Sequence, residues 1–299
     1  MDVLETLDSL QSAVEEDKKK EQKKSKQEYH FDKLKMYFGE DYKINDITIS
    51  IPTIGDILRV GESNYYQSIA PFLNNSTSIR VMLYDVFHKD WNKTKDIEVF
   101  YILYQFQLYQ SHNDNPFKAL SLLFDISFDN FELIQVSKNR KNEDCKSLAL
   151  LDKENGRIIY EDEYMEIAEY IRTMMNIHPK IEKAKGKTTK HWILQEDRMK
   201  EKQNQDKEND STLLPLVSAC VNHPGFKYKL EELKQVNICQ FMDSVQRIQK
   251  YEQGTAALHG IFGGMVSAKD VPQDLINFMG ELESLIFYCI KIKILKEEK

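Results

Sequence analysis

The chain has 299 residues, of which 41% are hydrophobic and 30% are charged, and this composition excludes a wholly disordered protein. Its formal net charge of -7 argues against a protein whose main task is to neutralise phosphates, although a local basic patch is still compatible with it. No apolar run approaches the roughly 18 residues that cross a bilayer, and the N-terminal stretch lacks the basic head and apolar block of a signal peptide, so we expect a cytosolic protein that does not bind membranes.

The first 28 residues combine an apolar stripe with a highly charged run. Helical spacing relates the apolar positions Val3, Leu4, Leu7, Leu10 and Val14, and the sequence EEDKKKEQKKSKQE follows them. We therefore predict a charged amphipathic N-terminal extension over residues 1–28. Its apolar stripe would dock either on the chain's own core or on a partner.

A mixed α+β domain is predicted over residues 29–178. Isoleucines alternate at positions 47, 49 and 51 and indicate a strand that stops at Pro52. Short helices follow, interrupted at Gly61 and Pro71. Residues 78–110 then give an aromatic-rich amphipathic helix, a polar turn and a second apolar run.

The second half of this domain has the pattern of a β-meander followed by a helix. The apolar runs are Leu123–Phe128, Phe131–Val136, Ser147–Leu151 and Arg157–Tyr160. Asn155-Gly156 separates the last two runs, and this dipeptide is favoured where both central residues of a turn have positive φ. Apolar residues with helical spacing then run from Tyr164 to Met175, before His178-Pro179 ends the helix.

Residues 179–210 are predicted to form a charged hinge and linker helix. Five lysines lie between Lys180 and Lys190, and Trp192 follows them. Lysines bind phosphates and an aromatic ring stacks on a base, so this stretch is the best candidate for nucleic-acid binding. Acidic residues at positions 182, 196 and 197 dilute the charge, and a tryptophan more often anchors a helix to a core, so nucleic acid is the less favoured partner.

An α-helical bundle domain is predicted over residues 211–299, which makes the fold class α+β. A long helix presents one broad apolar face, made of Val236, Cys239, Phe241, Met242, Val245, Ile248, Gln249 and Tyr251. The sequence HGIFGGM contains three glycines, as phosphate-binding loops do, but it follows a helix rather than a strand. We interpret it as a helix C-cap and a chain reversal.

Tests for catalytic or metal chemistry give no positive result. Cys220-x-x-His223 has the spacing of zinc ligands, and Cys239 and His259 lie downstream, but the context indicates a buried thiol and a turn histidine. The four widely scattered cysteines are interpreted as reduced thiols. There is no strand-to-helix elbow bearing a nucleophile. We expect no catalytic residue, no metal and no cofactor, and hence no enzyme.

Several stretches resemble proteins of tailed bacteriophages that infect Gram-positive hosts. They are ITISIPTIGDILRVGESNYYQSI, the meander ending in GRIIYEDEYMEIAEYIRTMM, KTTKHWILQEDRMKEK, and LLPLVSACVNHPGFKYKLEELKQVNICQFMDSVQRIQKY. The chain is similar to tail assembly chaperones in this group. The resemblance implies a non-enzymatic protein that acts in the cytoplasm of the infected host, keeps the helical tape measure protein soluble, and helps tail-tube subunits to assemble around it.

An apolar groove or helix face would hold such a partner. The candidate partner-binding residues are Phe241, Met242, Val245, Ile248 and Trp192. The same faces would also make an ordinary core. A permanent structural component of the virion and a phage nucleic-acid-binding protein that uses residues 180–200 are the alternatives, and formation of a homo-oligomer stays open.

Overall fold

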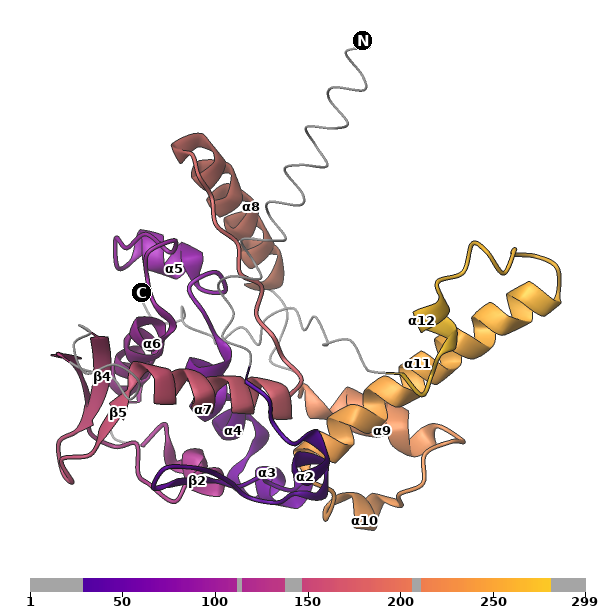
Figure 1. The fold of residues 1–299 in the computed structure, drawn as a ribbon, viewed down its shortest axis with the longest axis horizontal. Helices are drawn as coiled ribbons and strands as arrows, with labels where there is room; N and C mark the ends of the chain where they lie inside the picture. Colours follow the sequence, from indigo (N-terminus) through magenta and orange to yellow (C-terminus); the bar gives the residue numbers. More distant parts are fainter. Residues whose placement is uncertain (1–28, 112–114, 138–146, 206–210, 281–299) are drawn as a thin grey trace, which may run out of the picture. The chain divides into compact units, whose positions relative to one another are not determined.

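A computed structural model of the protein describes residues 29–111, 115–137, 147–205 and 211–280 (Figure 1). Residues from Asp32 onward belong to one compact unit and Tyr29 to Phe31 belong to another, so each is considered by itself. The described residues of the second unit combine helices with two small antiparallel sheets, which confirms the α+β fold class. The predicted N-terminal extension over residues 1–28 lies outside the described residues.

Strands and helices are each numbered in the order in which they occur along the chain. The strands are β1 (Tyr42–Ile44), β2 (Ile47–Ile49), β3 (Phe131–Val136), β4 (Ser147–Asp152) and β5 (Ile158–Tyr160). The helices are α2 (Lys33–Phe38), α3 (Ile54–Val60), α4 (Glu62–Leu73), α5 (Arg80–Asp85), α6 (Asp96–Gln110), the 3₁₀ helix η1 (Lys118–Leu122), α7 (Glu161–Met174), α8 (Lys187–Gln205), α9 (Leu213–Asn222), α10 (Leu230–Leu233), α11 (Ile238–Phe262) and α12 (Gln273–Ile276).

Two antiparallel sheets contain the strands. β1 pairs with β2, and the predicted alternation of isoleucines is confirmed because Ile47 and Ile49 are both buried. β3, β4 and β5 form the second sheet in that order, so the last three runs of the predicted meander are strands. The first run, from Leu123 to Phe128, is predicted wrongly. It makes one isolated bridge, between Phe124 and Ile49.

A side chain explains why no strand forms there. The carboxylate of Asp125 accepts a hydrogen bond from the backbone N–H of Thr48 at 2.9 Å, and so occupies a donor that a neighbouring strand would use. The aromatic rings of this run join the core instead. Phe72 of α4 lies 5.5 Å from Phe124 and 5.6 Å from Phe128, measured between ring centroids.

The turn between β4 and β5 also differs in detail from its prediction. Gly156 has a φ of 68°, whereas Asn155 is not among the residues with positive φ. The N–H of Gly156 donates to the carbonyl of Asp152 at 2.9 Å, and the Asp152 carboxylate accepts from Glu154 N–H at 2.9 Å. The loop therefore turns around the aspartate, and only its glycine needs the left-handed conformation.

Helix α4 continues through Pro71, which corrects the predicted interruption at that residue. Proline has no N–H, so the carbonyl of Gln67, four residues earlier, loses its usual partner in the helix. The side-chain Nε2 of the buried Gln107 on α6 donates to that carbonyl at 2.9 Å. A contact from a distant helix thus supplies the missing hydrogen bond.

The predicted helix after the meander is confirmed as α7. Its acidic start is structural, since the Glu163 carboxylate accepts a hydrogen bond from the backbone N–H of Tyr160 at 2.9 Å. Near its end, the buried Arg172 donates to the Phe72 carbonyl at 3.0 Å and pairs with Asp96 at 3.0 Å. This arginine joins α7 to the end of α4 and the start of α6.

The segment before α11 contacts the start of α3. Ile54 N–H donates to the Val236 carbonyl and Gly55 N–H donates to the Lys234 carbonyl, both at 2.9 Å. A Cβ on Gly55 would lie 2.7 Å from the Lys234 oxygen, so only glycine fits at this crossing. Backbone hydrogen bonds therefore connect residues of the predicted mixed domain with residues of the predicted helical domain.

The predicted long helix and its glycine-rich end are both confirmed. α11 continues to Phe262, Gly264 has a φ of 70°, and the N–H of Met265 donates back to the Gly260 carbonyl at 2.9 Å. These are the features of a left-handed helix C-cap. Among the described residues, none of the helices combines the length and the apolar composition needed to cross a membrane.

Candidate interaction surface on helix α8

The run that leads into α8 is extended and is fixed to the region around α5. Side chains of residues 75–92 bond its backbone, through the contacts Asn75 Nδ2 to Lys180 O at 2.9 Å, Trp91 Nε1 to Glu182 O at 3.2 Å, and Asn92 Nδ2 to Ala184 O at 2.7 Å. Glu182 N–H in turn donates to Thr77 Oγ1 at 3.1 Å. These bonds satisfy backbone groups that a free linker would expose to water.

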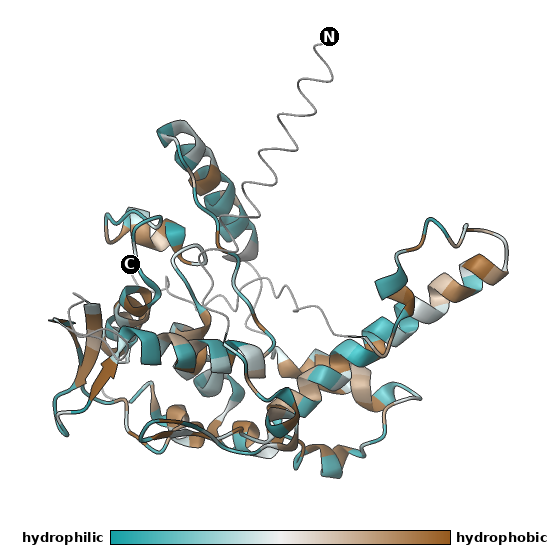
Figure 2. Ribbon diagram, in the orientation of Figure 1, coloured by the Kyte–Doolittle hydropathy of each residue, from teal (hydrophilic) through white to brown (hydrophobic). Residues whose placement is uncertain are grey.

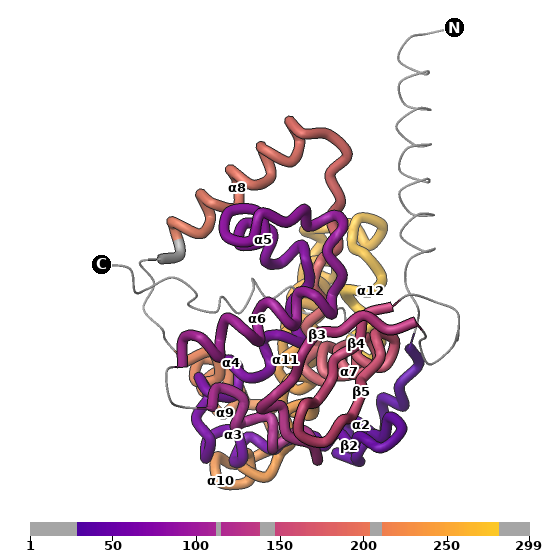
Figure 3. The backbone as a smooth tube through the Cα atoms, turned by 90° about the vertical axis from the view of Figure 1, so that its left-hand side faces the viewer, coloured from indigo at the N-terminus to yellow at the C-terminus, as the bar shows by residue number. Residues whose placement is uncertain are grey.

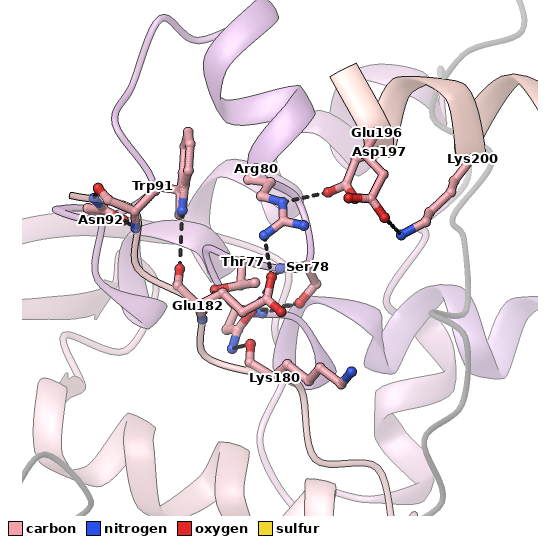
Figure 4. A network of polar contacts seen from close by, with 12 residues as sticks. Thr77, Ser78, Arg80, Trp91, Asn92, Lys180, Glu182, Glu196, Asp197 and Lys200 are labelled. Carbon is pink, nitrogen blue, oxygen red and sulfur yellow. Dashed lines mark hydrogen bonds and ion pairs between the residues drawn. The ribbon is translucent and has the colours of Figure 1, made fainter. Parts of the chain in front are cut away.

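Arg80 is the centre of a polar network beside this run (Figure 4). Its Nη1 pairs with Glu182 Oε2 at 2.6 Å, and its Nε pairs with Asp197 Oδ2 at 2.5 Å. Burial opposes the charge of the guanidinium, but the hydrogen bonds to both carboxylates outweigh it and raise the pKa of Arg80. One buried arginine therefore holds both the extended run and α8.

Two further ion pairs fix the same face of α8. Lys190 Nζ lies 2.6 Å from Asp90 Oδ2 and 5.3 Å from the centroid of the Trp91 ring, a cation–π distance. Arg198 bonds both carboxylate oxygens of Asp85, at 2.5 and 3.0 Å. The bidentate geometry fixes direction as well as distance.

A small apolar cluster lies beneath these ion pairs. It is made of Ile79, Leu83, Trp91, Val99, Leu103, Ala184 and Leu194. α5, α6, the extended run and α8 all contribute to it, and α5 and α8 lie side by side (Figure 3). Most of α8 is hydrophilic (Figure 2). Leu194 is the buried residue that this helix supplies to the cluster.

The opposite face of α8 exposes two large apolar side chains. Trp192 is 69% exposed and Met199 is 63% exposed. Seven residues are about two turns of a helix, so these side chains lie on one face, about 10 Å apart along the axis. Between them Glu196 forms a surface ion pair with Lys200 at 2.6 Å. We call the side chains of Trp192, Glu196 and Met199 the outer face of α8.

The other candidate partner-binding residues lie on α11 and are mostly covered. Phe241, Met242 and Val245 are buried by the chain itself, and Ile248 is half-buried. α11 packs against α2 and α9. Of the five candidates, Trp192 has the surface that a partner would need. Met199 was absent from that set, and its spacing from Trp192 is the signal that identifies it.

The cysteine and histidine side chains tested for metal binding have other surroundings. His223 Nε2 lies 2.9 Å from Glu252 Oε1, and its Nδ1 accepts a hydrogen bond from Gly225 N–H at 3.1 Å. Burial raises the pKa of the Cys220 thiol, and burial together with Asp243 raises the pKa of Cys239 to about 11. Within the described residues no group of three or more potential ligands is arranged to hold a metal ion.

Comparison with known proteins returned no family model, no curated protein and no solved structure that matches this chain.

Proposed function

We propose that the protein is a non-enzymatic assembly protein that binds a helical protein partner on the outer face of α8. The observation that carries the proposal is the exposure of Trp192 and Met199 on a helix whose other face is fixed by ion pairs. A fixed helix presents its side chains to a partner without a further ordering cost. Tryptophan is enriched among residues that dominate binding energy, and methionine adapts to varied apolar surfaces.

The resemblance to phage tail assembly chaperones suggests the partner. We propose that it is the tape measure protein, bound in the cytoplasm of the infected bacterium while tail-tube subunits assemble. Apolar anchors two turns apart are suited to the apolar stripe of a long partner helix. The proposal needs no catalytic residue and no cofactor.

The test is co-expression with the candidate tape measure protein from the same genome, followed by pull-down and measurement of affinity. Replacing both Trp192 and Met199 with alanine is expected to weaken binding about 30-fold or more, as loss of an interface hot spot does. The matched control is Tyr109→Ala, which removes an aromatic side chain that is 82% exposed on α6. Equal binding by all three proteins, or a partner that stays insoluble and unbound, would contradict the proposal.

A chaperone differs from a permanent component of the virion in where it is found. The chaperone is expected in infected cells and absent from purified particles. Its presence in particles at a fixed ratio to the tube protein would favour the structural alternative.

A further inference from the structure

The extended run before α8 has an unbalanced surface, although its sequence contains charges of both signs. Glu182 of this run and Asp197 of α8 both form ion pairs with Arg80. The lysines of the run at positions 180, 183 and 185, and Lys187 at the start of α8, are all exposed. An ion pair requires a nitrogen–oxygen distance of 4.0 Å or less. Among the described residues, no carboxylate oxygen lies that close to any of these four ammonium groups.

The contacts of this run separate its charges. Glu182 reaches Arg80 and Ala184 enters the apolar cluster, whereas Lys183 and Lys185 are exposed. From residue 182 to residue 185 the side chains therefore alternate between two sides, as they do along an extended chain. Lys180 extends away from the network (Figure 4). Because the backbone of this run is hydrogen-bonded at residues 180, 182 and 184, the lysines project from a fixed backbone next to the start of α8.

Resting on the proposed function, we infer that the partner of α8 is an acidic amphipathic helix, with an apolar stripe on Trp192 and Met199 and carboxylates opposite the lysines of residues 180–187. We call these four lysines the basic run. Charge complementarity supports this occupant, since an apolar pair and a basic group lie next to each other on one continuous segment. Complementary charges also increase the rate of association and fix the direction in which a helix binds.

A nucleic acid fits this surface less well than a peptide does. A nucleic-acid strand carries a negative charge on each nucleotide, so a strand that reaches Trp192 and Met199 also brings phosphates to Glu196. The side chain of Glu196 is 66% exposed on that face. A peptide can place carboxylates opposite the basic run alone.

The experiment uses the full chain and two synthetic amphipathic helical peptides of about 20 residues. Both have the same leucine stripe, and one end carries glutamates in the first peptide and lysines in the second. Binding is measured by fluorescence anisotropy of labelled peptides at low and at high salt. We expect the wild type to prefer the glutamate peptide about tenfold at low salt, and the preference to shrink at high salt.

The decisive variant is the double substitution Lys183→Glu and Lys185→Glu, with Lys43→Glu and Lys118→Glu as the control. All four are exposed lysines, and the control pair lies on β1 and η1. The first variant is expected to lose or reverse the preference between the peptides, and the control to keep it. An unchanged preference in the first variant would overturn the inference.

Two further measurements, on the Trp192→Ala variant and with a single-stranded oligonucleotide, distinguish failure of the charge inference from failure of the proposed function. If Trp192→Ala weakens both peptides equally while charge reversal has no effect, the inference about charge fails and the proposed function stands. If neither peptide binds, both proposals fail. Tighter binding of a single-stranded oligonucleotide than of the glutamate peptide, lost in the Lys183→Glu and Lys185→Glu variant, would assign the basic run to nucleic acid and overturn the inference.

Discussion

Helices α8 and α11 are held in place by opposite kinds of contact. The first turns of α11 bury Phe241, Met242 and Val245, so the apolar face of these turns is part of the core. α8 buries Leu194, and ion pairs to Asp85, Asp90 and Arg80 hold the rest of its inner face. Its Trp192 and Met199 side chains are left on the outside.

This difference shows how to read an apolar residue in a helix. A continuous apolar stripe, as on the first turns of α11, is covered by the chain itself because its burial stabilises the fold. Isolated apolar residues among charges, as on α8, stay exposed when ion pairs already fix the helix. The more polar of the two helices is consequently the better candidate for binding a partner.

The largest effect is expected from removing an anchor of α11. Phe241→Ala leaves a cavity under a fully buried side chain and should lower the free energy of unfolding by about 3–5 kcal/mol, measured by urea denaturation. Phe262→Ala on the same helix is the control, because Phe262 is 84% exposed and its loss should cost about 0.5 kcal/mol or less. Similar losses for both would mean that α11 is not anchored by its first turns.

Removing the anchor of α8 should cost less. Arg80→Met keeps most of the apolar stem but leaves Glu182 and Asp197 without their cation, and we expect a loss of about 2 kcal/mol. Amide hydrogen exchange should become faster in α8 and stay unchanged in α11. Arg59→Met, which removes a largely exposed arginine paired with Asp56, is the control and should change stability by about 0.5 kcal/mol or less. Unchanged exchange in α8 would show that Arg80 does not hold it.

Local patterns predicted the elements that depend on neighbouring residues. The periodicity of α7 and α11, the glycine-rich end of α11 and the α+β class are all confirmed. The errors arise where a distant residue intervenes. The Gln107 side chain replaces a hydrogen bond lost at Pro71, and the Asp125 carboxylate occupies an N–H of β2. Neither contact leaves a periodic signal in the sequence.

The candidate site was predicted in part for the same reason. Trp192 is conspicuous in a charged segment, and the sequence alone identifies it as a candidate. The balance of charge in the sequence around Trp192 is misleading. Arg80 pairs with Glu182 and Asp197, which lie 102 and 117 positions further along the chain. Only the fold shows which acidic residues are already paired and which lysines are left exposed.

A smaller effect is expected at the Asp90–Lys190 ion pair of α8. The hydrogen bond from Lys190 lowers the pKa of Asp90 below its ordinary value of 3.8. The carboxylate therefore contributes stability above that value, and the contribution is lost as the pH falls through the folded-state pKa. Asp90→Asn should lower the free energy of unfolding by about 0.5–1 kcal/mol at neutral pH, and the difference should close below pH 3.8 in urea denaturation series. A difference that persists in acid would point to a lost contact other than the ion pair.

The smallest effect is expected at Asp243 on α11. It should have the opposite sign, because here the substitution stabilises the protein. Burial raises the pKa of Asp243 above 3.8, although Arg247, 3.7 Å away, opposes the shift. Stability linked to this group is fully present below its unfolded pKa and is lost as the pH rises through the folded pKa, because ionisation charges a half-buried carboxyl. Asp243→Asn cannot ionise, so it should stabilise the protein by roughly 0.5 kcal/mol or less at neutral pH, with no gain in acid. Destabilisation at neutral pH would mean that the attraction of Arg247 outweighs burial, and that ion pairs hold α11 as well as α8.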